Sequence, residues 1–295
     1  MALVLSVLEQ GMIYSIMALG MYITYKILDF PDLTVDGSFP FGAALTATLI
    51  VRGVNPLVTL PICFVIGSLI GILTGLIHVK LKIRDLLSGI IMMTALYSVN
   101  LKIAGKANLP FYQNETIFDN EYLRALFPEN LYSFRKVIII CIVLVIVKIL
   151  LDAYMATKSG YLLKAVGDNE TLVTSMGKDK GVVKIIGLAI SNGLVALSGG
   201  MFAQQQRFFD IQSGTGTAVI GLASVIIGTS LLKKVTFLSV TTSVIIGAII
   251  YKACVALAIR VGFPAGWLKA ITALLFLIIL VIGRERKTKA RLKNV

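Results

Sequence analysis

The sequence predicts an all-α polytopic membrane protein with about nine transmembrane segments. Of its 295 residues, 57% are hydrophobic and only 15% are charged, and the mean hydropathy is +0.89. Soluble domains carry about 25% charged residues. Several apolar runs also exceed the roughly 18 residues that a helix needs to cross the hydrocarbon of a bilayer. A soluble core could not bury this much apolar surface, so a bundle of membrane helices is the expected fold class.

The apolar segments are separated by short polar stretches. They lie at 4–25, 39–52, 56–79, 86–104, 136–156, 183–203, 217–232, 236–258 and 267–283. The segments 39–52 and 217–232 are short for a perpendicular span, and both follow turn-rich stretches. In transporters, short segments at corresponding places in two halves point to the translocation path.

The whole chain, 1–295, reads as a single membrane domain. It consists of a first half (1–156), a polar break (157–182), a second half (183–283) and a basic tail (284–295). The stretches Phe30–Leu33 and Phe208–Ile211 resemble each other, and each leads through a Gly/Ser/Thr run into a short segment. This pattern predicts two inverted-repeat-like halves, although so few matching residues also fit a chance resemblance.

The basic residues give the expected orientation. Most of the 28 Lys and Arg fall in the stretches on one side of the membrane, including the polar break and the tail. Lys and Arg collect in cytoplasmic loops, so the polar break and the C-terminus are expected in the cytoplasm of a cell-membrane protein. With nine spans, the N-terminus is then outside. The external loop 105–134 is expected to be either an acidic and aromatic docking surface or a plain solvated loop.

The polar break is expected to contain a short helix outside the bilayer. Asp168 or Asn169 can cap its start, because their side-chain oxygens accept free backbone N–H groups. Gly177 suits the left-handed position after its end. Leu172, Val173 and Met176 are expected to share one face. Such a helix could be offered to a partner, and an ordinary loop helix is the alternative.

Polar residues within the apolar segments have two interpretations. Thr94, Ser98 and Asn100, and likewise Ser191 and Asn192, can hold helices together by hydrogen bonds or line the path of a polar solute.

Charged residues within the segments are expected to reach the interface or to pair inside the bundle, as Lys148 can with Asp152 one turn away. A role of Lys148 in proton coupling is the less favoured interpretation.

Two small-residue patterns are expected to serve packing. Gly67, Gly71 and Gly75 form a ridge along one segment that allows close helix approach. Leu197–Gly200 matches the opening of an ATPase signature, but it lies in an apolar segment and the chain has no GxxxxGK[ST] phosphate loop. No nucleotide site is therefore expected.

The sequence shows no catalytic or metal-binding constellation. His78 is the single histidine, and no H-E-x-x-H or G-x-S-x-G motif is present. An intramembrane enzyme is thus the weakest of the functional classes considered.

Several motifs resemble ATP-binding cassette (ABC) importer permeases of the branched-chain amino acid and ribose permease superfamily. They are Gly11-x-x-Tyr14-Ser15-x-Met17-Ala18-Leu19-Gly20, the turn Phe30–Ser38, Leu163–Asn169, Met176-Gly177, Ala196–Gly200 and Ile220–Gly228. The chain is most similar to a branch paired with lipid-anchored binding proteins, in operons that suggest tryptophan or tyrosine. Its first loop departs from the Asn-Phe-Ala-His-Gly type of turn in branched-chain permeases, which argues against a branched-chain substrate.

The resemblance implies a type II ABC importer-like fold and a set of partners. These are an ABC ATPase that holds ATP and Mg²⁺ on the cytoplasmic side, an extracellular solute-binding lipoprotein, a second permease copy in a homodimer, and membrane lipid. Neither nucleic acid nor a cofactor in this chain is expected. The ATPase-coupling residues would be Lys164, Gly167, Asp168, Asn169, Glu170 and Gly177, and the candidate path residues are Asp32, Thr34, Asp36, Asn100, Asn192 and Gln205.

The expected function is uptake of a small polar solute, with an aromatic amino acid favoured. A sugar or nucleoside substrate is one alternative. A stand-alone ion-coupled secondary transporter, with Lys148 or Asp32 as the coupling site, is another.

Overall fold

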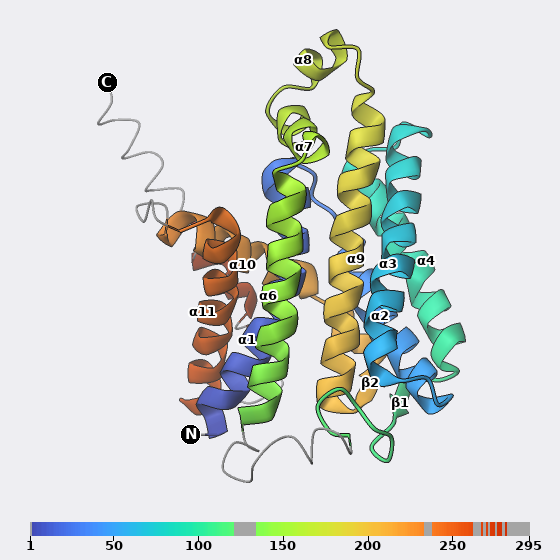
Figure 1. The fold of residues 1–295 in the computed structure, drawn as a ribbon, viewed down its shortest axis with the longest axis vertical. Helices are drawn as coiled ribbons and strands as arrows, with labels where there is room; N and C mark the ends of the chain where they lie inside the picture. The colour runs from blue at the N-terminus through green and yellow to red at the C-terminus, as the bar shows by residue number, and fades with distance from the viewer. Residues whose placement is uncertain are drawn as a thin grey trace.

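The computed structural model describes residues 2–120, 134–232, 238–261, 267, 270, 272–274, 276–278 and 281. These residues form an elongated helical bundle with a small β-ribbon at one end and two short helices at the other (Figure 1). The elements are α1 (Ala2–Met21), the π-helix η1 (Tyr22–Ile27), α2 (Val35–Val51), α3 (Pro56–Val79), α4 (Asp85–Ala104), β1 (Asn108–Pro110), α6 (Arg135–Met155), α7 (Lys158–Asp168), α8 (Glu170–Ser175), α9 (Lys180–Gln206), β2 (Phe208–Asp210), the 3-10 helix η3 (Ile211–Gly214), α10 (Thr217–Leu231) and α11 (Val240–Arg260).

The prediction of an all-α polytopic membrane protein is confirmed. Seven helices of the described part are long and apolar enough to cross a membrane, and α2 is a shorter apolar helix. Eight of the nine predicted segments coincide with described helices, often to within a few residues. The ninth segment, 267–283, is described only in part, and the tail 284–295 lies outside the described residues.

Local sequence signals place several helix ends. Asn55 accepts a hydrogen bond from the Leu57 N–H at 2.9 Å, and Pro56 occupies the first position of α3. Asp179 caps α9 in the same way through the Gly181 N–H at 2.7 Å. Gly105 ends α4 with a φ of 73°, in the left-handed region that glycine adopts without strain.

Helix α9 lies at the centre of the bundle and packs closely on α3. A Cβ atom at Gly71 would collide with the backbone carbonyl oxygen of Leu188, and one at Gly67 would collide with Ala196. The glycine ridge therefore lets the two backbones touch, and the packing interpretation of this ridge is confirmed. Figure 1 shows the two helices side by side along much of their length.

The ribbon end of α9 packs on α1 and α2. The Ser198 hydroxyl donates to the Ile13 carbonyl at 2.7 Å, and a Cβ atom at Gly199 would collide with the Phe39 carbonyl oxygen. The Leu197–Gly200 stretch is thus a helix-packing surface, as predicted.

Helices α2 and α10 both begin inside the bundle. Asn192 lies near the middle of the 27-residue α9, and the residues that begin α2 contact its side chain. The start of α10 contacts Asp36 in the first turn of α2. From there α2 runs to the ribbon end, where Thr48 donates to the Ile103 carbonyl, and α10 runs toward α7 and α8. The two short helices therefore both start within the bundle and run in opposite directions, and we call them the half-helices.

The β-ribbon was not predicted. Strands β1 and β2 pair antiparallel, with Leu109 opposite Phe209, although they lie about one hundred positions apart in the chain. Two three-residue strands give no periodicity that a sequence pattern could reveal.

The loop after β1 folds back onto the bundle. Phe111 and Phe118 are buried, and Asp119 forms ion pairs with Arg207 and Arg135. The expectation of an exposed aromatic surface holds for Tyr112 but is wrong for Phe111, because that ring fills the space beside β2. Two acidic residues of this loop, Glu121 and Glu129, lie outside the described residues.

Candidate functional site: two half-helix starts and a polar break

A buried polar network surrounds the start of α2. It consists of Asp32, Thr34, Ser38, Thr74 and Asn192, and we call it the Asp32 network. The Asn192 amide donates to Asp32 Oδ2 at 2.8 Å and accepts from the Ser38 hydroxyl at 2.7 Å. The Thr34 and Thr74 hydroxyls lie 3.2 Å apart. All five side chains are buried, so their mutual hydrogen bonds replace those that water would supply.

Asp32 also fixes the backbone where α2 begins. Its Oδ1 accepts a hydrogen bond from the Thr34 N–H at 2.9 Å, two residues along the chain. Short acidic side chains form this turn readily, and a carboxylate at a helix N-terminus interacts favourably with the helix dipole. The carboxylate therefore joins the start of α2 to the middle of α9.

Asp36 performs the same task for α10. Its carboxylate accepts hydrogen bonds from the Gly216 N–H at 3.1 Å, the Ala218 N–H at 2.7 Å and the Thr217 hydroxyl at 3.0 Å. The Asp36 carboxylate of α2 thus accepts hydrogen bonds from backbone N–H groups that have no partner within α10. Asp36 therefore holds the start of α10 to the first turn of α2, while Asp32 joins the start of α2 to α9.

The structure brings together part of the predicted path. Asp32, Thr34 and Asn192 meet in the Asp32 network, and Asp36 lies beside it. Asn100 donates from Nδ2 to the Gly37 carbonyl at 3.1 Å, and its buried Oδ1 has no partner among the described residues.

Gln205 does not belong to this group. It lies near the ribbon end of α9 and donates to the Glu9 carboxylate at 2.9 Å. It is remote from the Asp32 network because α9 carries Gln205 almost four turns beyond Asn192.

Sequence reasoning missed three members of the site: Ser38, Thr74 and Thr217. Ser38 and Thr217 lie at the ends of the two polar runs that precede the half-helices, and this position is the signal that could have identified them. Thr74 gives no such signal, because a threonine within an apolar segment is common.

Two lysines within spans have partners. Lys148 donates to Asp152 at 2.7 Å, which confirms the predicted pair, and Asp152 also accepts from the Thr241 hydroxyl. The Lys252 Nζ lies 3.5 Å from the centroid of the Tyr14 ring, an arrangement that attracts a cation to the ring face.

The polar break contains two short helices where one was expected. Asn169 separates α7 from α8, with an extended backbone, and its side chain accepts hydrogen bonds from the Thr171 and Leu172 N–H groups. The predicted cap is therefore confirmed for Asn169. Gly177 has a φ of 71°, as predicted for a residue after a helix end.

Helix α7 is attached to three other elements. Leu163 and Val166 are fully buried in the main core. A Cβ atom at Gly167 would collide with the Ile27 carbonyl oxygen at the end of η1. Lys164 reaches back to the Met155 carbonyl of α6 at 3.4 Å. The helix therefore packs directly on the backbone of η1.

Helix α8 is held mainly by one buried residue and one acidic residue. Val173 is fully buried, whereas Leu172 is 52% and Met176 is 64% exposed, so the predicted shared face is wrong for Val173. Glu170 pairs with Lys180 at 2.8 Å and with Lys184. Hydrogen bonds from these two lysines lower the pKa of Glu170 from 4.5 to about 2.

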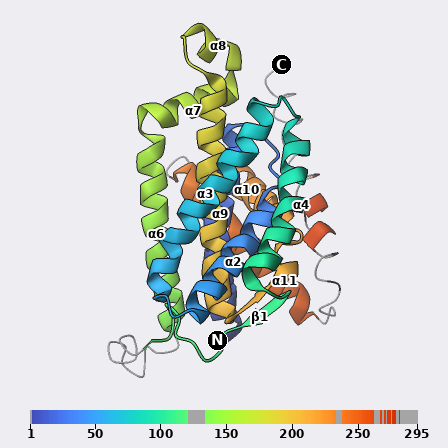
Figure 2. The same cartoon turned by 90° about the vertical axis from the view of Figure 1, so that its right-hand side faces the viewer.

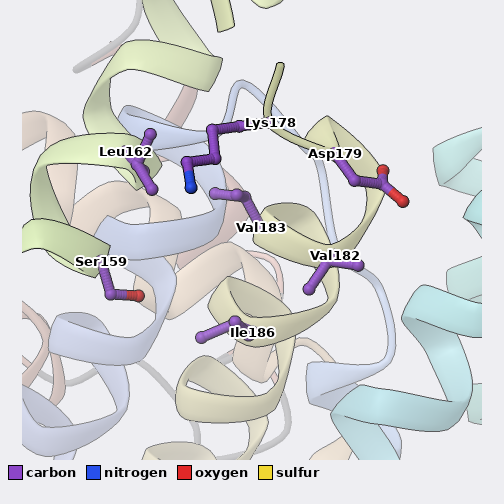
Figure 3. Close-up of a pocket in the computed structure, with 7 residues that line it drawn as sticks. All are labelled: Ser159, Leu162, Lys178, Asp179, Val182, Val183 and Ile186. Atoms are coloured by element: carbon purple, nitrogen blue, oxygen red, sulfur yellow. The ribbon is translucent and has the colours of Figure 1, made fainter. Parts of the chain in front are cut away.

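A cavity of about 330 Å³ opens between α7 and the start of α9, lined by Ser159, Leu162, Lys178, Asp179, Val182, Val183 and Ile186 (Figure 3). Leu162 from α7 faces Val183 from α9 across it. Its lining is mainly apolar. The charged residues Lys178 and Asp179 lie directly before α9.

The described residues hold no group of three His, Cys, Asp or Glu side chains that could bind a metal ion. His78, the single histidine of the sequence, contacts the Ile83 carbonyl at 2.9 Å through Nδ1 and packs against Phe30.

The sequence is similar to that of a known family of transport proteins. Residues 3–281 match the family described as branched-chain amino acid transport system, permease component. No solved structure matches the chain at a significant level.

Curated relatives cover most of the chain. The tyrosine transport system permease protein of Clostridioides difficile strain R20291 is 43% identical over 293 residues, 98% of this chain and 95% of that protein. The protein named "Probable branched-chain amino acid transport permease protein LivH" of Methanocaldococcus jannaschii is 26% identical over 226 residues, 72% of this chain and 70% of that protein. The ribose import permease protein RbsC of Escherichia coli K12 is 25% identical over 225 residues, 76% of this chain and 68% of that protein.

The family match, these relatives and the membrane-spanning bundle together show that the chain belongs to the branched-chain amino acid transport system permease family and is an integral membrane permease component of an ABC-type transport system.

Proposed function

We propose that this permease imports an aromatic amino acid, with tyrosine the favoured solute. The observation that carries the substrate is the 43% identity to a tyrosine transport system permease over nearly the whole of both chains. The branched-chain and ribose relatives are more distant, at 26% and 25% identity. The permease itself holds no cofactor and catalyses no reaction, and ATP and Mg²⁺ belong to a partner ATPase.

The polar break is the surface that the ATPase contacts, and force on this surface moves the permease. Leu172 on α8, Met176 directly after it and the cavity between α7 and α9 offer apolar contacts. Asp168 adds an exposed charge. Lys164, Gly167, Asn169, Glu170 and Gly177 set the shape of this surface and its attachment to the bundle.

A continuous series of contacts leads from α7 in the polar break to the starts of α2 and α10. Gly167 touches Ile27, and Leu163 lies with Leu28 against Gly187 of α9. Asp32 follows Leu28 by four residues and joins the Asn192 side chain. The intervening π-helix η1 is a wide, irregular turn of the kind that often occurs at functional sites. A shift of α7 therefore reaches the Asp32 network through five residues of chain.

The remaining partners follow from this assignment. The α7–α8 end faces the cytoplasm, so α1 begins outside and the ribbon end receives a solute-binding lipoprotein. A second copy of the chain completes the permease. The tail 284–295, which lies outside the described residues, is assigned to the cytoplasm by its basic residues.

Uptake of radiolabelled tyrosine by membrane vesicles from the natural host tests the proposal. Vesicles that contain this permease and its partners are expected to accumulate tyrosine only with ATP, and unlabelled tryptophan or phenylalanine should compete. Vesicles that lack the gene serve as the control.

Two results would overturn the proposal. Competition by ribose, a nucleoside or leucine but not by aromatic amino acids would assign another solute. Uptake by the purified chain alone, driven by an ion gradient and indifferent to ATP, would assign an ion-coupled secondary transporter. In the described structure Lys148 pairs with Asp152, and Asp32 accepts hydrogen bonds from Thr34 and Asn192.

A further inference from the structure

The cavity between α7 and α9 lies at the level where two membrane helices end. Helix α6 ends at Met155, directly before the turn that leads into α7, and α7 lies across the end of the bundle toward α9 (Figure 2). A Cβ atom at Gly181, in the first turn of α9, would collide with the side chain of Val79, the last residue of α3. The stretch 80–84 after α3 carries three basic residues, a type that gathers at the cytoplasmic surface of membrane proteins. The cavity therefore lies where the hydrocarbon of a bilayer meets the headgroups.

The walls of the cavity are apolar and extend along α9. Leu162 of α7 and Val183 of α9 line it, and Val182 and Ile186 are exposed one turn apart on α9. At a rise of 1.5 Å per residue, Ile186 lies about 9 Å along α9 from its start. The volume of about 330 Å³ falls within the range of about 300–1,000 Å³ that is usual for ligand pockets. This lining suits an apolar chain that enters from the hydrocarbon.

The mouth of the cavity carries a positive charge without an ionic partner. Figure 3 shows the Lys178 side chain extending toward Leu162 and Val183. Its amine forms no ion pair with the described residues. Asp179, the other charged residue of the lining, accepts a hydrogen bond from the Gly181 N–H at 2.7 Å and points away from the cavity in Figure 3. The charge that faces the cavity is therefore that of Lys178.

A ligand that fits this cavity combines a negative charge with an apolar chain. An anionic phospholipid has both, and Lys and Arg at a membrane surface attract such lipids. A free phosphate ion would pair with Lys178 but leave the apolar walls uncovered. An acidic side chain of a soluble partner would also supply the charge, but it carries no apolar chain that reaches Ile186 within the membrane part of α9.

We propose that this cavity binds an anionic phospholipid of the cytoplasmic leaflet, with the phosphate group paired to Lys178 and an acyl chain beside Val182 and Ile186. The inference goes beyond the proposed function and takes from it only the orientation of the permease. The bound lipid fills the apolar space between α7 and α9, and it leaves Leu172 and Met176 open to the ATPase.

Tryptophan fluorescence in vesicles tests the proposal. The sequence contains a single tryptophan, which Trp267→Phe removes, and Val182→Trp then places a reporter on the exposed cavity wall. The full chain is reconstituted in phosphatidylcholine with a small share of brominated phosphatidylglycerol or, in parallel, brominated phosphatidylcholine, whose acyl bromines quench tryptophan on contact. At equal content the brominated phosphatidylglycerol should quench about threefold more strongly, because its charge is held at the cavity. High salt should reduce this difference, because it screens the charges.

Three variants serve as controls. Ile146→Trp, on the exposed apolar face of α6, reports ordinary lipid contact, and the two brominated lipids should quench it equally. Lys178→Gln, added to Val182→Trp, should lower quenching by phosphatidylglycerol to that by phosphatidylcholine. Lys158→Gln removes a lysine at the start of α7 that does not line the cavity, so the preference should persist.

Equal quenching of Val182→Trp by both lipids would overturn the inference, and so would a preference that survives Lys178→Gln. Absence of quenching by either lipid would place the cavity in water. The thermal unfolding midpoint in detergent checks the fold of each variant, and Ile186→Trp, also exposed, replaces Val182→Trp if that midpoint falls. None of these measurements depends on transport, so their outcome is separate from that of the proposed function.

Discussion

Asn192 in the middle of α9 binds two side chains at the start of α2. One amide satisfies the Asp32 carboxylate and the Ser38 hydroxyl, each at a distance below 3 Å. An asparagine suits this position because it offers a donor and an acceptor on one side chain. A carboxylate or an aliphatic residue of similar size could satisfy one of these partners at most.

Asn192→Ala is therefore expected to lower the stability of the permease. The substitution leaves a buried carboxylate oxygen and a buried hydroxyl without partners, which costs about 1–3 kcal/mol and more for a charged group. Thermal unfolding in detergent should show a lower midpoint. Thr229→Ala is the control, because that hydroxyl bonds only within its own helix. A midpoint equal to that of the control would show that Asp32 finds another donor.

Glu170 gives a pH-dependent contact at the α7–α8 end. Hydrogen bonds from Lys180 and Lys184 lower its pKa from 4.5 to about 2. A lowered pKa means that the contact contributes fully above pH 4.5 and is lost as the pH falls toward 2. The charged link between α8 and α9 is thus complete at any physiological pH.

The titration of Glu170 can be followed by NMR of carboxyl-labelled glutamate in nanodiscs. The signal, assigned by its absence in Glu170→Gln, should titrate with a midpoint near 2. Replacing both Lys180 and Lys184 by glutamine should move the midpoint back toward 4.5. A midpoint near 4.5 in the unaltered chain would show that the two ion pairs do not persist in solution.

At the scale of elements, backbone contact between α3 and α9 determines how the bundle is held together. Lipid supplies no hydrophobic drive for helix association, so close packing and hydrogen bonds must replace it. Gly67, Gly71 and Gly75 all face α9, and a Cβ atom at each would meet atoms of that helix.

Gly71→Ala should separate α3 from α9. In an isolated helix this change is favourable by about 1 kcal/mol, but here the new methyl group collides with the Leu188 carbonyl oxygen. Overpacking of this kind typically costs about 1–3 kcal/mol. Thermal unfolding in detergent should give a lower midpoint for Gly71→Ala, whereas Val65→Leu on the exposed face of α3 should leave it unchanged. A stabilised Gly71→Ala variant would mean that helix propensity outweighs packing at this site.

At the scale of the whole molecule, the polar break lies at one end and the ribbon at the other, with the half-helix starts between them (Figures 1 and 2). Asp36 joins the two half-helices and Gly167 joins the polar break to η1. Packed backbone contacts therefore connect the α7–α8 end with the middle of the molecule.

Asp168 offers the sharpest test of the proposed coupling. Its carboxylate is exposed and forms no ion pair with the described residues, so its replacement should leave the fold intact. Asp168→Lys is expected to lower ATP-dependent tyrosine uptake at least tenfold while ATPase activity and membrane levels persist. Thr171→Ala, also exposed on the polar break, is the control. Full coupling in Asp168→Lys would remove Asp168 from the ATPase contact, and adding Glu170→Lys would then test whether α8 contributes.

The sequence by itself determined the class of fold and the local ends of its elements. Apolar length predicts the helices, and caps such as Asn169 and turns such as Gly177 act through neighbouring backbone, so their effects can be inferred without the rest of the chain. The short segments that form α2 and α10, and the turn-rich stretches before them, were evident for the same reason.

Only the tertiary structure decided which of these residues meet. Asp32, Thr34 and Asn192 were predicted as path residues, but the contact between Asp32 and Asn192 spans 160 positions of chain, and no local pattern encodes such a pair. The grouping of Gln205, the pairing of β1 with β2 and the place of Lys252 over Tyr14 depend on how helices cross. Local signals fix backbone conformation, whereas distant contacts are set by the packing of complete helices, and that packing is a property of the bundle as a whole.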